Sequence, residues 1–446
     1  MNSTEIVQVR GRQVWDSRGR PTVEAEVTVA SGKSGRAIAP SGASKGSGEA
    51  VDLRDGNARL GGFGVTRAVS HVNGEIARAL LGCDASCQAK VDQILIELDG
   101  TANKARLGGN ALVAVSMAVL HAAAAAKDNP LYVHLLGDRN PVMPLPEVQI
   151  FGGGAHAGHR VDIQDFMIMA PKAGTFAEAL KWTAEVYRAA GSLMSDMGRL
   201  QGVADEGGYW PAFDSNEAAL DTLIRAIERA GFTPGDEIAI SLDIAASDLY
   251  LNNRYRLALD GRTLDSDDMA AMLIDWLDRY PIISIEDPLS EFDEDGLVRF
   301  TQAVGDRVQI VGDDFLVTNA ARIRKASLAG ACNAVLVKPN QAGTIAETVE
   351  AIEASRAANW GAILSARSGE TEDVTIVHLA VGWGVRQLKV GSFSRSERMA
   401  KWNEGIRIEE TLGNRAHFAG TYFSDQFLSS RSRNMQNRNT CKIELD

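Results

Sequence analysis

Six short runs rich in isoleucine and valine recur in the second half of the chain, and five of them end in a charged residue. Their last residues are separated by 43, 27, 25, 28 and 23 positions, mostly about the length of one strand–helix unit. A ring of such strands with polar carboxyl ends is typical of a βα barrel. A barrel is therefore predicted, with a doubly wound open sheet as the competing fold. The ends are Asp243, Glu286, Asp313, Lys338, Ala366 and Lys389.

The first part of the chain has a different pattern. Residues 23–29 alternate apolar and polar side chains, as in a half-buried strand, and residues 65–127 have helical periodicity. Strands followed by helices favour a small α+β domain. We expect this domain to cover residues 1–140, the barrel to cover residues 141–428, and a polar tail to cover residues 429–446.

Composition restricts the partners and the compartment. The 446 residues carry a net charge of −12, which argues against nucleic acid as the main partner but not against a small anion. Four cysteines fit neither a disulfide framework nor a zinc signature, which favours the cytoplasm. The start has no apolar signal core. The apolar run 112–126 is too short for a bilayer, so it predicts a buried helix and no membrane contact.

Three acids at successive strand ends, Asp243, Glu286 and Asp313, are the hard oxygen ligands that Mg²⁺ prefers. The alternative is that each acid caps the helix that follows it. Lys338 and Lys389 also end strands. A lysine at this place could act as a general base or bind a substrate carboxylate, or it could be an ordinary surface lysine.

Three further segments contain candidate chemistry. Glu206 lies in Asp-Glu-Gly-Gly, where glycines could let an acid protrude into a site or could simply form a turn. Residues 152–159 are glycine-rich with His156 and His159, a weak metal signal and no Walker loop. Arg367 and Ser368 follow a strand and could clamp a phosphate, or form a solvated loop.

Taken in order, these motifs resemble enolase from about residue 6 to residue 423. The segments that carry the resemblance are Asp16-Ser17-Arg18-Gly19, Pro40-Ser41-Gly42-Ala43-Ser44, Leu53-Arg54-Asp55-Gly56, His156-Ala157-Gly158, Asp205-Glu206-Gly207-Gly208, Ser284-Ile285-Glu286-Asp287-Pro288, Asp313-Asp314, Val337-Lys338, Arg367-Ser368-Gly369-Glu370-Thr371 and Arg395-Ser396-Glu397-Arg398.

The resemblance implies an α/β fold, an enolase-type modified (β/α)8 TIM barrel with an N-terminal α+β capping domain. It implies a homodimer or a higher homo-oligomer, and two Mg²⁺ ions per site, the second held with help from Ser44. It also implies a role for each remaining candidate. These are Lys338 as the base that removes the C2 proton of 2-phosphoglycerate, Glu206 as the acid, Lys389 on the substrate carboxylate, Arg367 and Ser368 on the phosphate, and His156 on a closing loop.

The chain departs from the enolase pattern inside the expected site. Asp165, assigned to catalysis, stands where the family has Glu, beside Gln164, which we assign to the substrate. Asp is one methylene shorter, so its carboxylate cannot hold the same position without backbone movement. The other departures are Ala366 for His, Gly48 for His, Gly152 for Asn and Lys45 for Thr.

These changes remove bulk and add one cation, as a larger and more anionic substrate would require. They predict a carboxyphosphonoenolpyruvate synthase of phosphonate antibiotic biosynthesis. Such an enzyme joins a phosphoglycerate-derived unit to CMP-activated phosphonoformate with loss of CMP, so a cytidine nucleotide ester would be a partner and Lys45 would be one of the substrate-binding residues. The alternatives are an ordinary enolase, which converts 2-phosphoglycerate to phosphoenolpyruvate and water, and a non-catalytic binding protein on an enolase scaffold.

Overall fold

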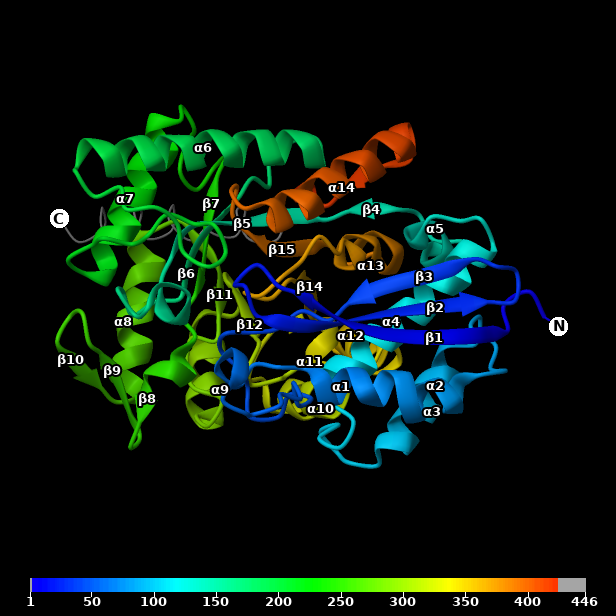
Figure 1. Ribbon diagram of the computed structural model, residues 1–446. Helices are drawn as coiled ribbons and strands as arrows, with labels where there is room; N and C mark the ends of the chain where they lie inside the picture. The colour runs from blue at the N-terminus through cyan, green and yellow to red at the C-terminus, as the bar shows by residue number, and fades with distance from the viewer. Residues whose placement is uncertain (1, 424–446) are drawn as a thin grey trace, which may run out of the picture.

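The computed structural model describes residues 2–423, which form an amino-terminal sheet with helices and a larger barrel (Figure 1). The predicted polar tail lies outside the described residues. The sheet is antiparallel in the order β1-β2-β3. On β2 the alternating side chains Val23, Ala25, Val27 and Val29 are fully buried, as the sequence pattern predicts. The strands are β1 Ile6–Trp15, β2 Pro21–Val29 and β3 Ser34–Ile38.

Helix α4 forms the core of this amino-terminal part. It packs against β2 and β3 and, among the described residues, is the one helix long and apolar enough to cross a membrane, yet 83% of it is buried. The prediction of a buried helix in this segment is confirmed. The helices of this part are η1 Arg59–Gly62, α1 Thr66–His71, η2 Val72–Ile76, α2 Ala77–Leu80, α3 Gln88–Asp99, α4 Gly109–Ala126 and α5 Leu131–Leu136.

Eight strands close the barrel in the order β5-β6-β7-β11-β12-β13-β14-β15. All neighbours are parallel except β6, which is antiparallel to both β5 and β7. The barrel prediction is confirmed and the open sheet is wrong, since β15, the last strand in this order, pairs with β5, the first, and closes the ring. The strands are β5 Leu145–Gly152, β6 Asp165–Met169, β7 Ala239–Asp243, β11 Ile282–Glu286, β12 Gln309–Gly312, β13 Ala334–Val337, β14 Gly361–Ser365 and β15 Gln387–Gly391.

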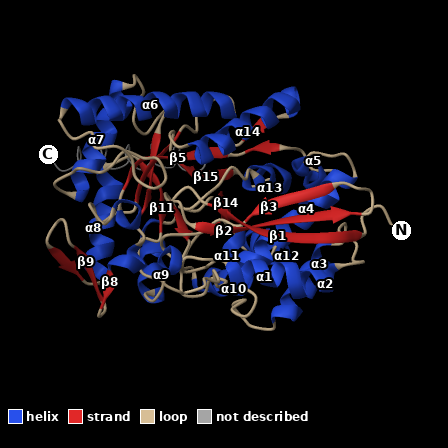
Figure 2. Ribbon diagram, in the orientation of Figure 1, coloured by secondary structure: helices blue, strands red, loops and turns tan. Residues whose placement is uncertain are grey.

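Helices surround the strands of the barrel (Figure 2). Several begin at a side chain that accepts a hydrogen bond from the first turn, as at Thr175, Ser215, Asp265, Asp293, Asn319 and Thr344, a common helix start. The main helices are α6 Phe176–Asp196, α7 Asn216–Arg229, α8 Ser266–Arg279, α9 Glu294–Val304, α10 Ala320–Ala329, α12 Ile345–Ala357, α13 Thr375–Trp383 and α14 Ser396–Leu412.

Short elements complete the structure. They include a small antiparallel sheet of β8, β9 and β10 and a two-stranded parallel pair of β4 and β16. Their bounds are β4 Val142–Met143, η3 Gly154–Ala157, η4 Ala246–Leu249, β8 Tyr250–Leu251, β9 Arg254–Leu257, β10 Arg262–Leu264, α11 Pro339–Ala342, η5 Gly413–Arg415, β16 His417–Phe418 and α15 Gly420–Phe423.

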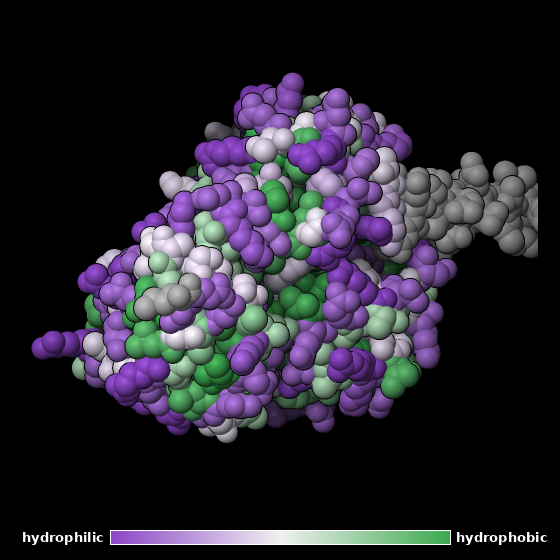
Figure 3. Space-filling view, turned by 90° about the vertical axis from the view of Figure 1, so that its right-hand side faces the viewer, coloured by the Kyte–Doolittle hydropathy of each residue, from purple (hydrophilic) through white to green (hydrophobic). Residues whose placement is uncertain are grey.

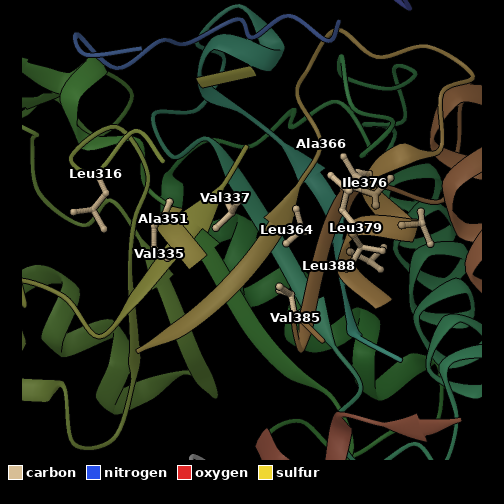
Figure 4. Close-up of a cluster of buried hydrophobic side chains, with 14 of the residues drawn as sticks. Leu316, Val335, Val337, Ala351, Leu364, Ala366, Ile376, Leu379, Val385 and Leu388 are labelled. Atoms are coloured by element: carbon tan, nitrogen blue, oxygen red, sulfur yellow. The ribbon is translucent and has the colours of Figure 1, made fainter. Parts of the chain in front are cut away.

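One continuous apolar core runs through both parts of the molecule. In the region between β13, β14, β15 and the helices outside them, Val337, Leu364 and Leu388 belong to one buried cluster with Ile376 and Leu379 (Figure 4). The face on the amino-terminal side of the molecule is largely hydrophilic, with scattered apolar patches (Figure 3).

Because the interior of the molecule is apolar, the polar residues that lie inside the barrel mouth are exceptions that need a chemical explanation.

Candidate active site

Three carboxylates meet at the carboxyl ends of adjacent barrel strands. Asp243 ends β7, Glu286 ends β11 in register with it, and Asp313 directly follows β12. All three are at most 5% exposed. They do not cap the helices that follow, because α8, α9 and α10 are capped by other residues.

Lys389 on β15 holds two of these carboxylates together. Its Nζ lies 2.9 Å from Oδ2 of Asp243, 2.8 Å from Oε2 of Glu286 and 3.5 Å from Oδ2 of Asp165. Burial, reinforced by the negative charge of Asp243, raises the pKa of Glu286 well above its usual value. The mouth therefore concentrates more negative charge than one lysine offsets, which is where a cation would be stabilised.

Lys338 directly follows β13, the strand next to β12. In the order of strands Asp313 therefore stands between Lys338 and the two other carboxylates, Asp243 and Glu286. It is 8% exposed, so the surface-lysine alternative is wrong. Its Nζ forms an ion pair with Asp313, whose Oδ1 also accepts a hydrogen bond from Gln341 at 2.9 Å. Burial lowers the pKa of Lys338, but the attraction of Asp313 outweighs it and the net pKa is raised.

A second group consists of His156, Asp165 and Glu206, whose polar atoms lie within 4.8 Å of one another. His156 Nδ1 lies 3.1 Å from Asp165 Oδ1, and Nε2 lies 3.8 Å from Glu206 Oε1. Burial opposes the charged imidazole, yet the two carboxylates raise the pKa of His156 to about 9. His159 is exposed, so the two histidines do not form a metal pair.

Arg367 and Ser368 lie at the junction of the barrel and the amino-terminal part. The Arg367 guanidinium donates to both carboxylate oxygens of Glu49, at 3.0 and 3.1 Å, and to the carbonyl of Ser44 at 3.0 Å. Ser368 Oγ accepts a hydrogen bond from Arg18 at 3.2 Å. The solvated-loop alternative is wrong, because Arg367 and Ser368 are 4% and 3% exposed.

One pocket brings together most of the predicted site residues. Gln164, whose Nε2 donates to Asp243 at 3.0 Å, lines it together with Ser44. Glu286 and Asp313 do not line it themselves, but each forms an ion pair with a lysine that does, Lys389 and Lys338 respectively. The lining consists of Gly42, Ala43, Ser44, His156, Gln164, Asp165, Glu206, Asp243, Lys338, Ser365, Ala366, Arg367, Ser368 and Lys389.

Lys45 does not line this pocket. Its side chain is 45% exposed and its Nζ lies 3.4 Å from Oδ2 of Asp52 in the amino-terminal part. A cation paired with Asp52 and outside the pocket does not add positive charge to the substrate. The predicted contact between Lys45 and the substrate is therefore not supported by the geometry.

The predicted enlargement of the site is also not observed at the two glycines. A Cβ atom at Gly152 would lie 2.7 Å from Ala204 Cβ, and one at Gly48 would lie 2.3 Å from Nη2 of Arg322. Neighbouring side chains thus fill the space that the glycines leave. Ala366 is 6% exposed and is drawn within the buried apolar cluster, near Ile376 (Figure 4).

Sequence reasoning missed several polar residues that support the pocket. Glu49 holds Arg367, Arg18 holds Ser368, and the buried Gln149 donates to Asp165. Arg18 lies in a quoted motif, so its position in the sequence carried a signal. Gln149 lies in β5, a strand that the sequence pattern did not predict, and nothing in its sequence context indicated a role.

A closed barrel with carboxylates and lysines at the carboxyl ends of its strands defines an enzyme of the barrel class. Residues 6–135 match the protein family described as "Enolase, N-terminal domain", and residues 140–427 match the family described as "Enolase, C-terminal TIM barrel domain". "Enolase 1" of Desulfitobacterium hafniense (strain Y51) is 50% identical over 421 residues, which cover 94% of this chain and 96% of that relative. The chain belongs to the enolase family, and it is a lyase of the enolase superfamily.

The prediction of a carboxyphosphonoenolpyruvate synthase is wrong. It is overturned by the 50% identity to an enolase over nearly the whole chain. The physical premise also fails at the two glycines, where Arg322 and Ala204 occupy the space expected to be free, and at Lys45, which pairs with Asp52. The predicted link to phosphonate antibiotic biosynthesis and to a cytidine ester has no support, and the non-catalytic alternative does not fit a lyase.

Proposed function

We propose that the protein is an ordinary enolase, which dehydrates 2-phosphoglycerate to phosphoenolpyruvate and water. The observation that carries the proposal is one buried pocket lined by both Lys338 and Glu206, a base and an acid. The elimination needs both, since the C2 proton and the C3 hydroxyl must leave the same molecule. The 50% identity to an enolase agrees with this proposal.

In the proposed reaction Lys338 takes the C2 proton, and the electron pair of the C–H bond forms the C2–C3 double bond. Glu206 gives a proton to the C3 hydroxyl, which leaves as water. Lys338 must be neutral when it acts. Its ion pair with Asp313 raises its pKa, so weakening that attraction is a condition for catalysis.

Binding would rest on the cations around the pocket. Arg367, with Ser368 beside it, would hold the phosphate, because a guanidinium offers several donors in one plane. Lys389 would face the carboxylate of the substrate. His156, whose pKa is raised to about 9, carries a positive charge at neutral pH and would favour the anionic substrate near Glu206.

Mg²⁺ fits the donor set at the barrel mouth. Asp243, Glu286 and Asp313 supply only oxygen ligands, and among the described residues Oε1 of Glu286 is buried without a hydrogen-bond partner. When bound, the metal would stabilise negative charge that develops on the substrate carboxylate. We propose two ions per site, the second with help from Ser44, which lines the same pocket.

We also propose a cytoplasmic homodimer with an amino-terminal capping domain over residues 1–140 and a catalytic barrel over residues 141–428. Membership of the enolase family supports the assembly. The division into two domains is supported by the matched regions, since the first ends at residue 135 and the second begins at residue 140. Cys83, Cys87 and Cys332 are free thiols, which is compatible with a reducing compartment.

The purified full-length protein with 2-phosphoglycerate and Mg²⁺ tests the proposal, with phosphoenolpyruvate followed by ³¹P NMR. Product should form, should stop when EDTA removes the metal, and should fall on the order of 10²–10⁴-fold in Lys338→Ala. Lys325→Ala is the matched control, because this exposed lysine pairs with Glu294 and neither residue lines the pocket. No product from the wild-type protein, or full activity of Lys338→Ala, would contradict the proposal.

A further inference from the structure

We propose that Gln149 is a positioning residue, which fixes the Asp165 carboxylate and through it the relative placement of His156 and Glu206. The inference rests on the proposed function, because it concerns the acid side of that reaction. Gln149 lies on β5 and is fully buried. A buried amide needs partners for both its nitrogen and its oxygen, so its bonds define what it holds.

Both ends of the Gln149 amide are engaged. Nε2 donates a hydrogen bond to Oδ1 of Asp165, and Oε1 accepts one from the backbone N–H of Gly208 at 2.8 Å. A backbone N–H only donates and a carboxylate only accepts, so the amide has one possible orientation. Gln149 therefore joins β6, which carries Asp165, to the loop that carries Glu206.

These bonds close a ring around the acid group. The Asp165 oxygen that accepts from Gln149 lies 3.1 Å from Nδ1 of His156, whose Nε2 lies 3.8 Å from Glu206. Glu206 stands two residues before Gly208, which donates back to Gln149. Moving the Gln149 side chain would thus displace both the carboxylate that orients His156 and the loop that presents Glu206.

The backbone around Gln149 is shaped to its side chain. A Cβ at Gly208 would lie 2.4 Å from Gln149 Oε1, and a Cβ at Gly152 would lie 3.2 Å from Gln149 Cδ. Glycine at both positions makes room for the long glutamine side chain. Because Asp165 is short, the glutamine supplies the reach that spans the gap between β5 and the carboxylate.

The competing interpretation is that Gln149 only satisfies polar groups in the barrel interior. Gln309 and Gln387 do this elsewhere in the barrel. They are the first residues of β12 and β15, and Nε2 of Gln309 donates a hydrogen bond to Oε1 of Gln387 at 2.8 Å. The two interpretations differ in what the length of the side chain does. If Gln149 positions Asp165, the summed length of the Gln149 and Asp165 side chains must be preserved. If Gln149 only fills the interior, that sum does not matter.

A reciprocal methylene swap tests this requirement. The variants are Gln149→Asn, Asp165→Glu and the double variant, with Gln309→Asn as the matched control in the same barrel. Steady-state kinetics with 2-phosphoglycerate should show each single variant reducing kcat on the order of 100-fold, with little change in KM, as a misplacement near 1 Å does. The double variant should regain most of that loss, and Gln309→Asn should keep the wild-type kcat.

A second readout does not depend on activity. The pH midpoint of the His156 ring proton, followed by NMR, should move in Gln149→Asn and return toward the wild-type value in the double variant. Multiplicative losses in the double variant, or an unmoved His156 midpoint in Gln149→Asn, would overturn the inference. An inactive wild-type protein would overturn the proposed function instead, while the NMR titration would still decide whether Gln149 positions Asp165.

Discussion

Arg367 and Glu49 form a two-pronged ion pair, with Nη1 3.0 Å from Oε2 and Nη2 3.1 Å from Oε1. Both side chains are buried, and they come from different parts of the molecule, Arg367 from the barrel and Glu49 from the amino-terminal part. The pair therefore aligns a cation of the pocket and connects the two parts at the same point.

Glu49→Gln should weaken substrate binding more than catalysis. The neutral amide loses one charge-assisted contact, so the Arg367 guanidinium is held less firmly. A hydrogen bond to a charged group is worth about 1.5–3 kcal/mol. We expect KM for 2-phosphoglycerate to rise about tenfold or more, with kcat changing less. Glu353→Gln on the surface, where Glu353 pairs with Arg356, is the control, and an unchanged KM in Glu49→Gln would contradict the argument.

The charge of His156 makes stability depend on pH. Burial alone would lower the pKa of His156, but Asp165 and Glu206 raise it to about 9, above the value near 6.5 of an unfolded chain. The stabilisation is therefore complete below about pH 6.5 and is lost as pH rises through about 9, a change of up to roughly 3 kcal/mol.

Urea unfolding of the metal-free protein at several pH values measures this dependence. The free energy of unfolding should fall between pH 6.5 and 9.5 in the wild-type protein and in His417→Gln, whose histidine is exposed. In His156→Gln that decline should be much smaller. An equal decline in His156→Gln would show that another group is responsible.

The sequence predicted the fold where strands were continuous apolar runs. All six predicted runs became strands of the barrel, from β7 to β15. The two strands that escaped detection, β5 and β6, contain Pro146, Glu147, Gln149 and Asp165. The proline and the polar side chains interrupt the apolar pattern by which a buried strand is recognised. Gln149 and Asp165 are there because this side of the barrel interior holds the acid group.

The sequence also predicted most of the pocket, but it misjudged the available space. Asp243, Lys338 and the other strand-end residues could be placed because parallel strands share one end. The effect of Gly48 and Gly152 could not be predicted, since it depends on Arg322 and Ala204, which approach only in the folded chain. A small residue in a sequence is a cavity only when no neighbour fills it.

Ser47 and Glu291 connect the loop that carries Ser44 to the barrel. Ser47 donates its backbone N–H to both carboxylate oxygens at 3.2 Å and its hydroxyl to Oε2 at 2.6 Å. Glu291→Ala removes all three bonds and should raise KM severalfold, since an exposed set of this kind contributes about 1 kcal/mol. Hydrogen exchange of residues 41–48 should become faster. Unchanged exchange there would contradict the argument that the Ser47–Glu291 hydrogen bonds hold this loop against the barrel.

Gly152→Ala tests whether there is spare room beside Ala204 and Gln149, at the end of β5. The new methyl group would lie 2.7 Å from Ala204 Cβ and 3.2 Å from Gln149 Cδ, so the neighbours must move, at a cost of about 1–3 kcal/mol. Thermal unfolding should show this loss, and kcat should fall because Gln149 is displaced. Gly74→Ala is the control, because its Cβ would meet nothing within 4 Å and alanine in a helix is about 0.5–1 kcal/mol better than glycine. If Gly152→Ala kept wild-type stability and rate, the space would be free after all, and the filling by Ala204 and Gln149 could not be the reason why glycine stands at this position.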